Sequence, residues 1–317
     1  GVAGFIGSTL AEKLLHDGHN VRGIDSFTNY YPPRMKEKNI ENCLKHTNFS
    51  LIRQDLDTLD LSASVEKADY FFHLSAQPGV RASWGKEFAT YVKNNISVTQ
   101  KILESLKNNT TLKKFVFASS SSVYGNQSSM MNEDTSLTRP VSPYGVTKLA
   151  AENLVNLYFK NYGVPTISLR YFTVYGPKQR PDMAFTRFFY SIIKEQKLTI
   201  FGNGEQTRDF TYVEDVVKAT MNAATSDHVG EILNIGGGSV FSLTQITEFM
   251  KEITEQKLEI NFKKEQKGDV KHTSADISKS EKLINYKSST DIKYGLTQQY
   301  EYIKTNLKLY DGIVNYV

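Results

Sequence analysis

Residues 1–25, GVAGFIGSTLAEKLLHDGHNVRGID, decide the fold of this chain. Gly1, Gly4 and Gly7 form a G-x-x-G-x-x-G pattern that runs directly into an amphipathic helical stretch. Such glycines allow a tight turn and let the backbone approach a pyrophosphate closely, and the helix N-terminus then offers N–H groups and a positive dipole end. The short apolar run VRGID (21–25) follows as a strand. The stretch therefore predicts a dinucleotide-binding turn at the start of an α/β fold.

Asp25 ends that strand, about 20 residues beyond the glycine loop. A carboxylate there can accept hydrogen bonds from an adenosine ribose and would repel a 2′-phosphate, which favours NAD over NADP. The alternative, a glycine-rich turn before an unrelated helix, does not account for three spaced glycines together with the strand-end aspartate. A dinucleotide-binding unit also needs a hydrophobic strand before its first glycine, so we expect the native protein to extend several residues upstream of Gly1.

Bulk properties favour a soluble cytoplasmic enzyme. The 317 residues are 39% hydrophobic and 23% charged, with a net charge of +4, which is ordinary for a globular protein and leaves no basic run that would suggest nucleic acid or a membrane surface as a partner. The single cysteine, Cys43, excludes an internal disulfide and a cysteine-based zinc cluster. We find no stretch of 18 apolar residues and no signal peptide, and we expect no metal site.

Apolar strands alternate with helical patterns over the first half of the chain. Strands are expected at 49–54, 68–76, 113–119 and 164–172, and helices at about 87–107 and 144–162. This alternation predicts a Rossmann-type, doubly wound parallel sheet whose ligands lie beyond the carboxyl ends of the strands. Polar residues that follow the strands are candidates for that site: Asp55, His73 to Gln77, Ser119 to Ser122, and Thr173.

Regularity falls after about residue 175, where shorter strands (LTIFG, EILNIG, LEINF) alternate with helices near 183–195, 214–225, 242–254 and 291–306. We therefore expect an NAD-binding domain over residues 1–174 and a smaller C-terminal α/β substrate-binding region over 175–317, partly interleaved with the first.

Tyr144 and Lys148 form the candidate acid–base pair. Ser142 is a predicted N-cap and Pro143 a predicted first helical residue, so the spacing of four places the phenol and the ammonium on one helical face. A nearby cation favours a tyrosine phenolate, which can take a proton from a sugar hydroxyl. By itself the pair is also typical of a solvated helix face.

The motifs GVAGFIG, HLSAQPGVR, FASSSSVYG, SPYGVTK, LRYFTVYGP and GNGEQTRDFTYVEDVV together resemble the extended short-chain dehydrogenase/reductase family, specifically its nucleotide-sugar epimerases. The resemblance covers nearly the whole length. It implies Tyr144 as the base, Lys148 as the group that lowers the pKa of Tyr144 and binds the nicotinamide ribose, and Ser120 as a hydrogen-bond donor at the sugar C4 hydroxyl.

The resemblance also assigns binding residues. It implies that NAD is held by Gly1, Gly4, Phe5, Ile6, Gly7, Asp25, Asp55, Leu56, Leu74, Ala76, Tyr144 and Lys148. It implies that the UDP-sugar is held by Arg81, Asn95, Ser121, Ser122, Thr173, Arg180, Arg208 and Asp269. Other roles are possible for some of these residues: Asn95 on a helix surface, Asp55 in a turn, and Arg208 paired with Asp209. His73, on an apolar strand, is expected to be a core residue.

The serine run distinguishes reactions within the family. Related sugar dehydratases carry Thr-Asp-Glu before the Val-Tyr-Gly, and UDP-uronate decarboxylases carry a glutamate there, whereas this chain has Ser120, Ser121 and Ser122. Without an acid, elimination is disfavoured. The expected reaction is oxidation at C4 by NAD, rotation of the 4-keto sugar and return of the hydride to its other face.

The run RYFTVYGPKQRPDMAF (170–185) and the tyrosine-rich NYYPPRMK (29–36) resemble those of UDP-glucuronate 4-epimerases. Thr173, Ser122 and Arg180 are candidates to hold a C6 carboxylate, although Arg180 is also a candidate for the diphosphate. The alternatives are a UDP-glucose or UDP-N-acetylglucosamine 4-epimerase, a UDP-glucuronate decarboxylase, and a non-catalytic NAD-binding regulator.

The resemblance is broken at one binding position. The chain has Gln266-Lys267-Gly268-Asp269 where relatives have Arg-Pro-Gly-Asp, so Lys267 or another cation has to replace that arginine. The resemblance further implies a homodimer formed through the helices near 87–107 and 144–162.

Overall fold

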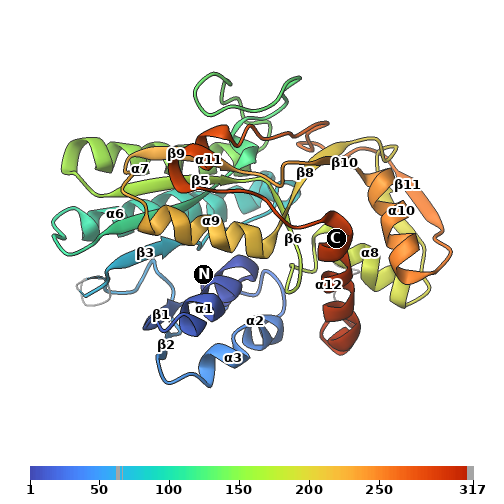
Figure 1. Ribbon diagram of the computed structural model, residues 1–317, viewed down its shortest axis with the longest axis horizontal. Helices are drawn as coiled ribbons and strands as arrows, with labels where there is room; N and C mark the ends of the chain where they lie inside the picture. Colours follow the sequence, from blue (N-terminus) through green and yellow to red (C-terminus); the bar gives the residue numbers. More distant parts are fainter. Residues whose placement is uncertain (62–64, 66, 313–317) are drawn as a thin grey trace.

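The computed structural model describes residues 1–61, 65 and 67–312. A four-stranded parallel sheet lies at its centre (Figure 1). Its strands, in spatial order, are β3 (Tyr70–His73), β4 (Lys114–Ser120), β5 (Thr166–Tyr171) and β9 (Glu231–Ile235). All three pairings are parallel, so the carboxyl ends of these strands meet at one edge, and the predicted doubly wound parallel sheet is confirmed.

A second parallel pair lies beside this sheet. It comprises β1 (Val21–Ile24) and β2 (Phe49–Ile52), covered by α1 (Phe5–His16), α2 (Pro33–Asn39) and α3 (Glu41–Leu44). Within the described residues β1 and β3 do not pair with each other. A cavity of about 730 Å³ lies there, lined by both strands and by parts of α1 and α9.

Helices cover both faces of the central sheet. One face carries α5 (Phe88–Tyr91), the π-helical segment η3 (Val92–Ser97), α6 (Val98–Leu106) and α7 (Pro143–Tyr162), and the other carries α1 and α9 (Val213–Thr225). Successive side chains of a strand point to opposite faces. Accordingly Phe115 and Phe117 of β4 pack with α6 and α7, whereas Val116 packs with α9.

The predicted helix after Ser142 is confirmed. The Ser142 Oγ accepts a hydrogen bond from the Gly145 backbone N–H at 3.1 Å, and Pro143 occupies the first turn. Gly163 ends α7 in the left-handed conformation, with a φ of 68°. The predicted helix over 87–107 is present but changes its hydrogen-bond pattern at Val92–Ser97, where one turn is π-helical.

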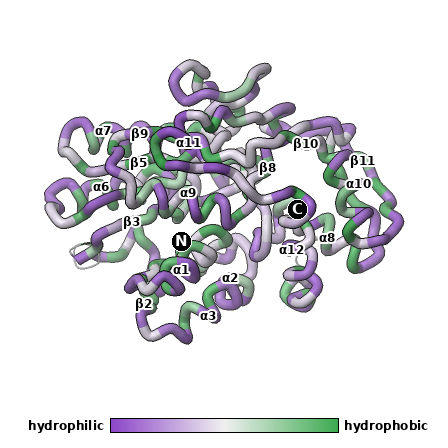
Figure 2. Tube along the Cα trace, in the orientation of Figure 1, coloured by the Kyte–Doolittle hydropathy of each residue, from purple (hydrophilic) through white to green (hydrophobic). Residues whose placement is uncertain are grey.

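The elements after residue 175 gather mostly at the opposite end of the molecule from α6 and α7 (Figure 1). The strands there and just before them are β6 (Thr173–Tyr175), β7 (Leu198–Phe201), β8 (Thr207–Tyr212), β10 (Val240–Ser242) and β11 (Ile260–Lys263). The helices there are α8 (Ala184–Ile193), α10 (Leu243–Thr254) and α12 (Ile292–Thr305), whereas α11 (Ser278–Ile284) packs against β9 and α9. Along α10 hydrophobic and hydrophilic segments alternate (Figure 2), and Ile246 and Met250 form its buried side.

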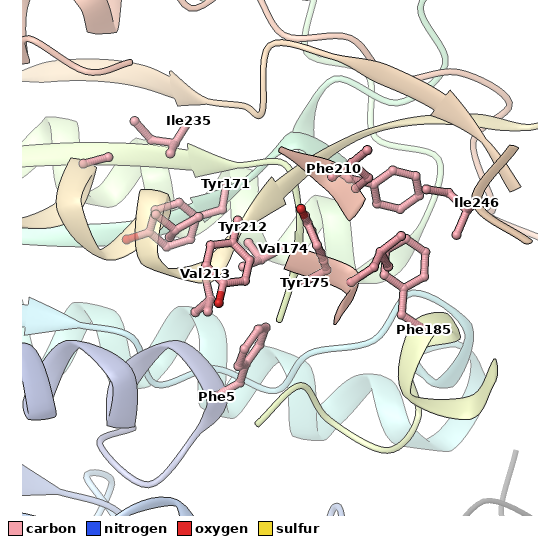
Figure 3. Close-up of a cluster of buried hydrophobic side chains, with 14 of the residues drawn as sticks. Phe5, Tyr171, Val174, Tyr175, Phe185, Phe210, Tyr212, Val213, Ile235 and Ile246 are labelled. Atoms are coloured by element: carbon pink, nitrogen blue, oxygen red, sulfur yellow. The ribbon is translucent and has the colours of Figure 1, made fainter. Parts of the chain in front are cut away.

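Aromatic side chains join this region to the central sheet. Phe185 packs 4.6 Å from Phe210 between ring centroids, and Tyr175 packs against both (Figure 3). Phe5, from the glycine loop, belongs to the same buried cluster. The core is therefore continuous from the first turn of the chain to the C-terminal elements.

The predicted division at residue 174 stays a prediction. Strand β9, from the second segment, completes the central sheet, and α9 packs on β4 and β5. Strands β6, β8 and β10 and helices α2, α3 and α11 were not predicted, since they are short or lack a clear periodic pattern. None of the described helices is long and apolar enough to span a membrane.

Candidate active site

A cavity of about 1240 Å³ opens at the carboxyl ends of the central strands. It extends from the glycine loop to the elements after residue 175. The predicted site residues that line it are Gly1, Gly4, Phe5, Ile6, Gly7, Asp25, Asp55, Leu56, Leu74, Ala76, Arg81, Ser120, Ser121, Ser122, Tyr144, Lys148, Thr173, Arg180 and Asp269. Asn95 and Arg208 are the two predicted site residues that are not among its lining residues.

The glycine loop is closed too tightly for side chains. A Cβ at Gly7 would lie 2.2 Å from the Gly1 carbonyl oxygen, and one at Gly1 would lie 2.7 Å from the Ser75 nitrogen. Gly4 caps α1 without any side-chain acceptor for the first N–H groups of the helix. A close backbone turn at an uncapped helix N-terminus fits a pyrophosphate, so these residues are suited to hold the dinucleotide NAD.

Asp25 lies at the wall of the same end of the cavity. Its Oδ2 accepts from the Ala3 N–H at 3.0 Å and its Oδ1 from the Phe27 N–H at 2.8 Å, so the carboxylate is fixed from both sides. Lys36, which the sequence reasoning missed, also lines the cavity, and its ammonium donates to the Thr28 carbonyl at 2.8 Å. Burial lowers the pKa of Lys36, and the negative charge of Asp25 opposes that shift.

Asp55 forms an ion pair with Lys93 at 3.3 Å at the cavity rim, where its side chain is 38% exposed. Its Oδ1 also accepts from the Asp57 N–H, a typical turn contact. The structure thus combines both roles expected for this residue, a turn-former and a cavity wall.

Tyr144 lies inside the cavity at the start of α7. Burial raises the pKa of its phenol, while the hydrogen bond with Ser120 and the positive charge of Arg180 lower it. The ring of Tyr91 packs edge-on against it with centroids 6.3 Å apart, and the Tyr91 hydroxyl donates to the Pro78 carbonyl at 2.9 Å. Tyr144 is thereby held between a hydroxyl partner and a fixed aromatic ring.

Lys148 is placed differently from the expectation. Its ammonium donates to the Ala118 carbonyl at 2.5 Å and lies 4.4 Å from the centroid of the Phe117 ring. Burial lowers the pKa of Lys148 to about 7, and Glu152 opposes the shift. Lys148 is not among the groups that shift the pKa of Tyr144 in this structure; Ser120 and Arg180 are. The physical reason is that the lysine side chain runs to the end of β4.

The serine run closes β4 and begins the short 3-10 helix η4 (Ser121–Val123). Ser120 Oγ accepts from the Ser122 N–H at 3.2 Å. All three serines line the cavity beside Tyr144. The three positions at which the sequence has serines in place of an acid are therefore part of the cavity wall.

Arg180 lines the same part of the cavity and is held by Asp182. The Nε and Nη2 groups of Arg180 donate to Oδ1 and Oδ2 of Asp182, both at 2.9 Å, and the Tyr30 hydroxyl donates to Asp182 at 3.3 Å. Burial raises the pKa of Asp182, but the Arg180 guanidinium lowers it by more, so the carboxylate stays ionised. Asp182 and Tyr30 were missed because only the fold brings residues 30 and 182 together.

The far end of the cavity is rich in arginine. Arg81 pairs with Asp269 at 2.8 Å, and its guanidinium carbon lies 4.3 Å from the centroid of the Phe201 ring. Arg187, which the sequence reasoning missed, lies 5.9 Å from the same ring. Burial lowers the pKa of Arg187, and the nearby charge of Arg81 adds to the effect. Lys267 is exposed and is not among the lining residues, so Arg81 is the cation that meets Asp269.

Arg208 does not pair with Asp209, whose carboxylate instead accepts from the Gly237 and Ala275 N–H groups. The Arg208 Nη1 donates to the Thr207 carbonyl at 2.8 Å. Its pKa is lowered by burial, with Asp269 opposing. The Asp269 charge thus acts on Arg208, which is not among the residues that line the cavity.

Asn95 is a buried link between elements. Its Oδ1 accepts from the Gln77 N–H at 2.7 Å and its Nδ2 donates to the Thr147 hydroxyl at 2.9 Å. The expected substrate contact is thus corrected to a contact that joins η3 to the β3 loop and α7; the neighbouring Asn94 is the residue that lines the cavity. His73 is a core residue as expected, since its Nε2 lies 3.0 Å from the Thr99 hydroxyl and burial holds its pKa well below the usual value.

Known proteins share this architecture over the whole length of the chain. The protein named uncharacterized UDP-glucose epimerase YtcB, from Bacillus subtilis, is 44% identical over 314 residues, which are 98% of each chain. The UDP-glucuronate 4-epimerase of Thermodesulfobacterium geofontis is 38% identical over 318 residues, 99% of this chain and 97% of that protein. The crystal structure of UDP-glucuronic acid 4-epimerase from Bacillus cereus, in complex with UDP-glucuronic acid and NAD, superposes with a TM-score of 0.94 at 45% identity, covering 96% of this chain and 98% of that one.

The family model described as the NAD dependent epimerase/dehydratase family matches residues 1–236. The structural match agrees with the parallel sheet of this chain. The chain therefore belongs to the NAD dependent epimerase/dehydratase family.

Proposed function

We propose that the chain is an NAD-dependent UDP-sugar 4-epimerase that interconverts UDP-glucuronate and UDP-galacturonate. The observation that carries this proposal is the composition of the cavity around Tyr144. A phenol, three serines and a guanidinium line this part of the cavity, and the Asp182 carboxylate is paired with that guanidinium. Relatives from Thermodesulfobacterium geofontis and Bacillus cereus are named for the same reaction.

In the proposed reaction Tyr144 moves the proton and the serines orient the sugar. When bound, NAD accepts the hydride from C4 and returns it to the opposite face of the 4-keto sugar. The Tyr144 oxygen takes the proton of the C4 hydroxyl and later gives it back, and the Ser120 hydroxyl bonds the same sugar oxygen. The Lys148 ammonium lines the same cavity and would bind the nicotinamide ribose of NAD.

A uronate needs a cation and the absence of a proton donor. Arg180 supplies the cation: its Nε and Nη2 groups bond Asp182, and its Nη1 group would donate a charge-assisted hydrogen bond to the substrate carboxylate. Ser122 and Thr173 supply hydroxyls. The 4-keto intermediate of a uronate is a β-keto acid that loses carbon dioxide readily when a proton is delivered. Among the described residues there, Asp182 is paired with Arg180 and the serines at 120–122 are very weak acids, so the proton beside the intermediate is the one that Tyr144 returns to the C4 oxygen.

A second candidate is 4-epimerisation of UDP-glucose or UDP-N-acetylglucosamine. Two observations favour it: the relative from Bacillus subtilis is named a UDP-glucose epimerase, and Arg180 is already neutralised by Asp182. A neutral C6 group would leave that pair undisturbed.

The remaining binding roles are also proposals. The pyrophosphate of NAD lies on Gly1, Gly4 and Gly7, flanked by Phe5 and Ile6, with its adenosine ribose on Asp25. Side chains around the rest of the dinucleotide are Asp55, Leu56, Leu74 and Ala76. The nucleotide of the substrate is bound at the far end by Arg81, Arg208 and Asp269, and Ser121 joins Ser122 at the sugar.

We further propose a cytoplasmic homodimer that forms through α5, α6 and α7. Large apolar side chains on and beside these helices are exposed, including Phe88 at 38%, Val146 at 48% and Leu157 at 51%. Light scattering coupled to size exclusion tests the dimer, and a charged residue at Leu157 should yield monomers.

Incubating the purified, NAD-loaded protein with each of three substrates tests the main proposal. UDP-glucuronate, UDP-glucose and UDP-N-acetylglucosamine are supplied in turn, and the products are separated by chromatography. We expect UDP-galacturonate from the first with kcat/KM at least tenfold above the others. Preference for a neutral sugar would select the second candidate, and release of carbon dioxide would show a decarboxylase.

A further inference from the structure

A buried ion pair lies between the central sheet and α7, next to Lys148. The Nη2 of Arg170 donates to Oε1 of Glu152 at 2.6 Å and its Nε donates to Oε2 at 3.0 Å, with side chains only 4% and 2% exposed. Ser119 Oγ donates to the same Oε2 at 2.5 Å. The Glu152 carboxylate therefore accepts three hydrogen bonds without any from solvent.

Strands β4 and β5 place Ser119 and Arg170 on the same face of the central sheet. Ser119 of β4 and Arg170 of β5 are directly opposite each other in the parallel register. Phe115 and Phe117 pack towards α6 and α7, and by the two-residue alternation of a strand Ser119 shares their face. The hydrogen bonds from Ser119 and Arg170 then meet Glu152 of α7 above that face.

Packing alone does not explain such a pair. Apolar side chains of similar volume commonly replace a buried ion pair with no loss of stability, because the charges lose their hydration. A charge at this place calls for a use beyond holding α7 to the sheet.

Lys148 precedes Glu152 by four residues on α7, which places both side chains on the same helical face. Lys148 is 3% exposed, and its ammonium has a carbonyl and an aromatic ring as immediate neighbours. Burial lowers its pKa to about 7, and Glu152 is the charge that opposes this.

Within the part of the chain that the structure describes, Glu152 is the one anion that acts on Lys148. On α7 the phenol of Tyr144 is the proposed proton carrier itself, and burial raises its pKa. On β3 the imidazole of His73 stays neutral because burial holds its pKa well below the usual value. On α6, Glu104 is paired with Lys107 and with Tyr158, and Tyr158 lies two to three turns beyond Lys148 on α7. The remaining charge, Arg170 on β5, is positive.

We propose that Glu152 is a positioning residue of the reaction, which keeps the Lys148 side chain protonated inside the cavity, and that Arg170 and Ser119 hold Glu152 in place for this purpose. The inference rests on the proposed role of Lys148. It implies that the two members of the ion pair act on Lys148 in opposite directions, Glu152 favouring the ammonium and Arg170 opposing it.

The test is the alkaline limb of the pH profile of kcat/KM, measured on the NAD-loaded enzyme with its best UDP-sugar from pH 6 to 10. Glu152→Gln keeps the shape of the side chain and one acceptor oxygen but removes the negative charge. The pH at which kcat/KM falls on the alkaline side should therefore drop by about one unit, which is a tenfold loss of kcat/KM at a fixed pH on that limb. Arg170→Met removes the opposing cation, and the limb should move up. If the pair only holds the fold, both variants lower activity at every pH and neither moves the limb, which would overturn the proposal.

Two further variants distinguish an effect on Lys148 from misfolding of the protein. The double variant E152M/R170M replaces the pair with apolar side chains; its limb should also move down, by less than in Glu152→Gln, and an unmoved limb would count against the proposal. Glu133 is a control, a half-buried carboxylate that accepts from the Asn234 N–H at 2.6 Å and whose charge is not one that acts on Lys148. Glu133→Gln should leave the limb in place. The proposed function is judged by wild-type turnover alone, so its failure is separate from a failure of this inference.

Discussion

Arg180→Met gives the sharpest test of the uronate proposal. Among the described residues that line the cavity, Arg180 is the cation whose charge lowers the pKa of Tyr144. A charge-assisted hydrogen bond contributes about 1.5–3 kcal/mol, and 1.4 kcal/mol is a factor of ten in an equilibrium. We therefore expect kcat/KM for UDP-glucuronate to fall by about 10- to 100-fold.

The same change has a predictable cost in stability. It leaves the Asp182 carboxylate with only the Tyr30 hydroxyl as a partner, and its side chain is 22% exposed. Breaking a buried pair from one side costs about 3–5 kcal/mol, and the partial exposure argues for the low end. At about 2 °C for each kcal/mol, Tm should fall by about 6 °C.

A second substitution separates the two effects. Asp182→Asn in the Arg180→Met background removes the unpaired charge, so it should restore most of Tm without restoring activity on the uronate. Turnover of UDP-glucuronate and UDP-glucose is measured by chromatography and Tm by calorimetry. If Arg180→Met lowers activity equally on both sugars, Arg180 binds something that the two substrates share, and the assignment of the carboxylate to Arg180 is refuted.

Three further predictions concern the rest of the cavity. Tyr144→Phe removes the proton carrier and should lower kcat by about 10²- to 10⁴-fold, with bound NAD unchanged by absorbance of the denatured extract. Gly7→Ala would place a Cβ 2.2 Å from the Gly1 carbonyl oxygen, so the purified protein should contain little NAD, and normal NAD content would contradict the tight turn. Arg81→Ala should weaken UDP binding by about 10- to 100-fold in calorimetry through the loss of a charge-assisted bond, while Lys267→Ala, which changes an exposed cation outside the cavity, should leave it unchanged.

Local patterns predicted the elements that carry the chemistry. The helix after Ser142 was predicted from an N-cap and a proline, and both occupy the predicted positions. The glycine spacing predicted the turn, and the apolar runs predicted the strands of the central sheet. These signals depend on neighbours within a few residues, so a sequence displays them directly.

Other features depend on contacts between distant residues. The sequence placed Asn95 at the substrate, whereas its amide joins Gln77 to Thr147. It offered Lys267 or another cation in place of the missing arginine, and the structure shows that Arg81 reaches Asp269 across 188 positions. It expected Lys148 to lower the pKa of Tyr144, whereas the lysine side chain runs to Ala118. None of these contacts has a local signature.

The sequence by itself determined the class of fold, the cofactor class and the acid–base pair, because glycine conformation, strand and helix periodicity and capping act over short distances along the chain. The tertiary structure decided the electrostatic setting of that pair. The charges that act on Tyr144 and Lys148 come from Arg180 and Glu152, and those are in turn fixed by Asp182 and Arg170. Burial sets the size of such effects, since charges interact strongly only where water is excluded, and burial is a property of the assembled fold.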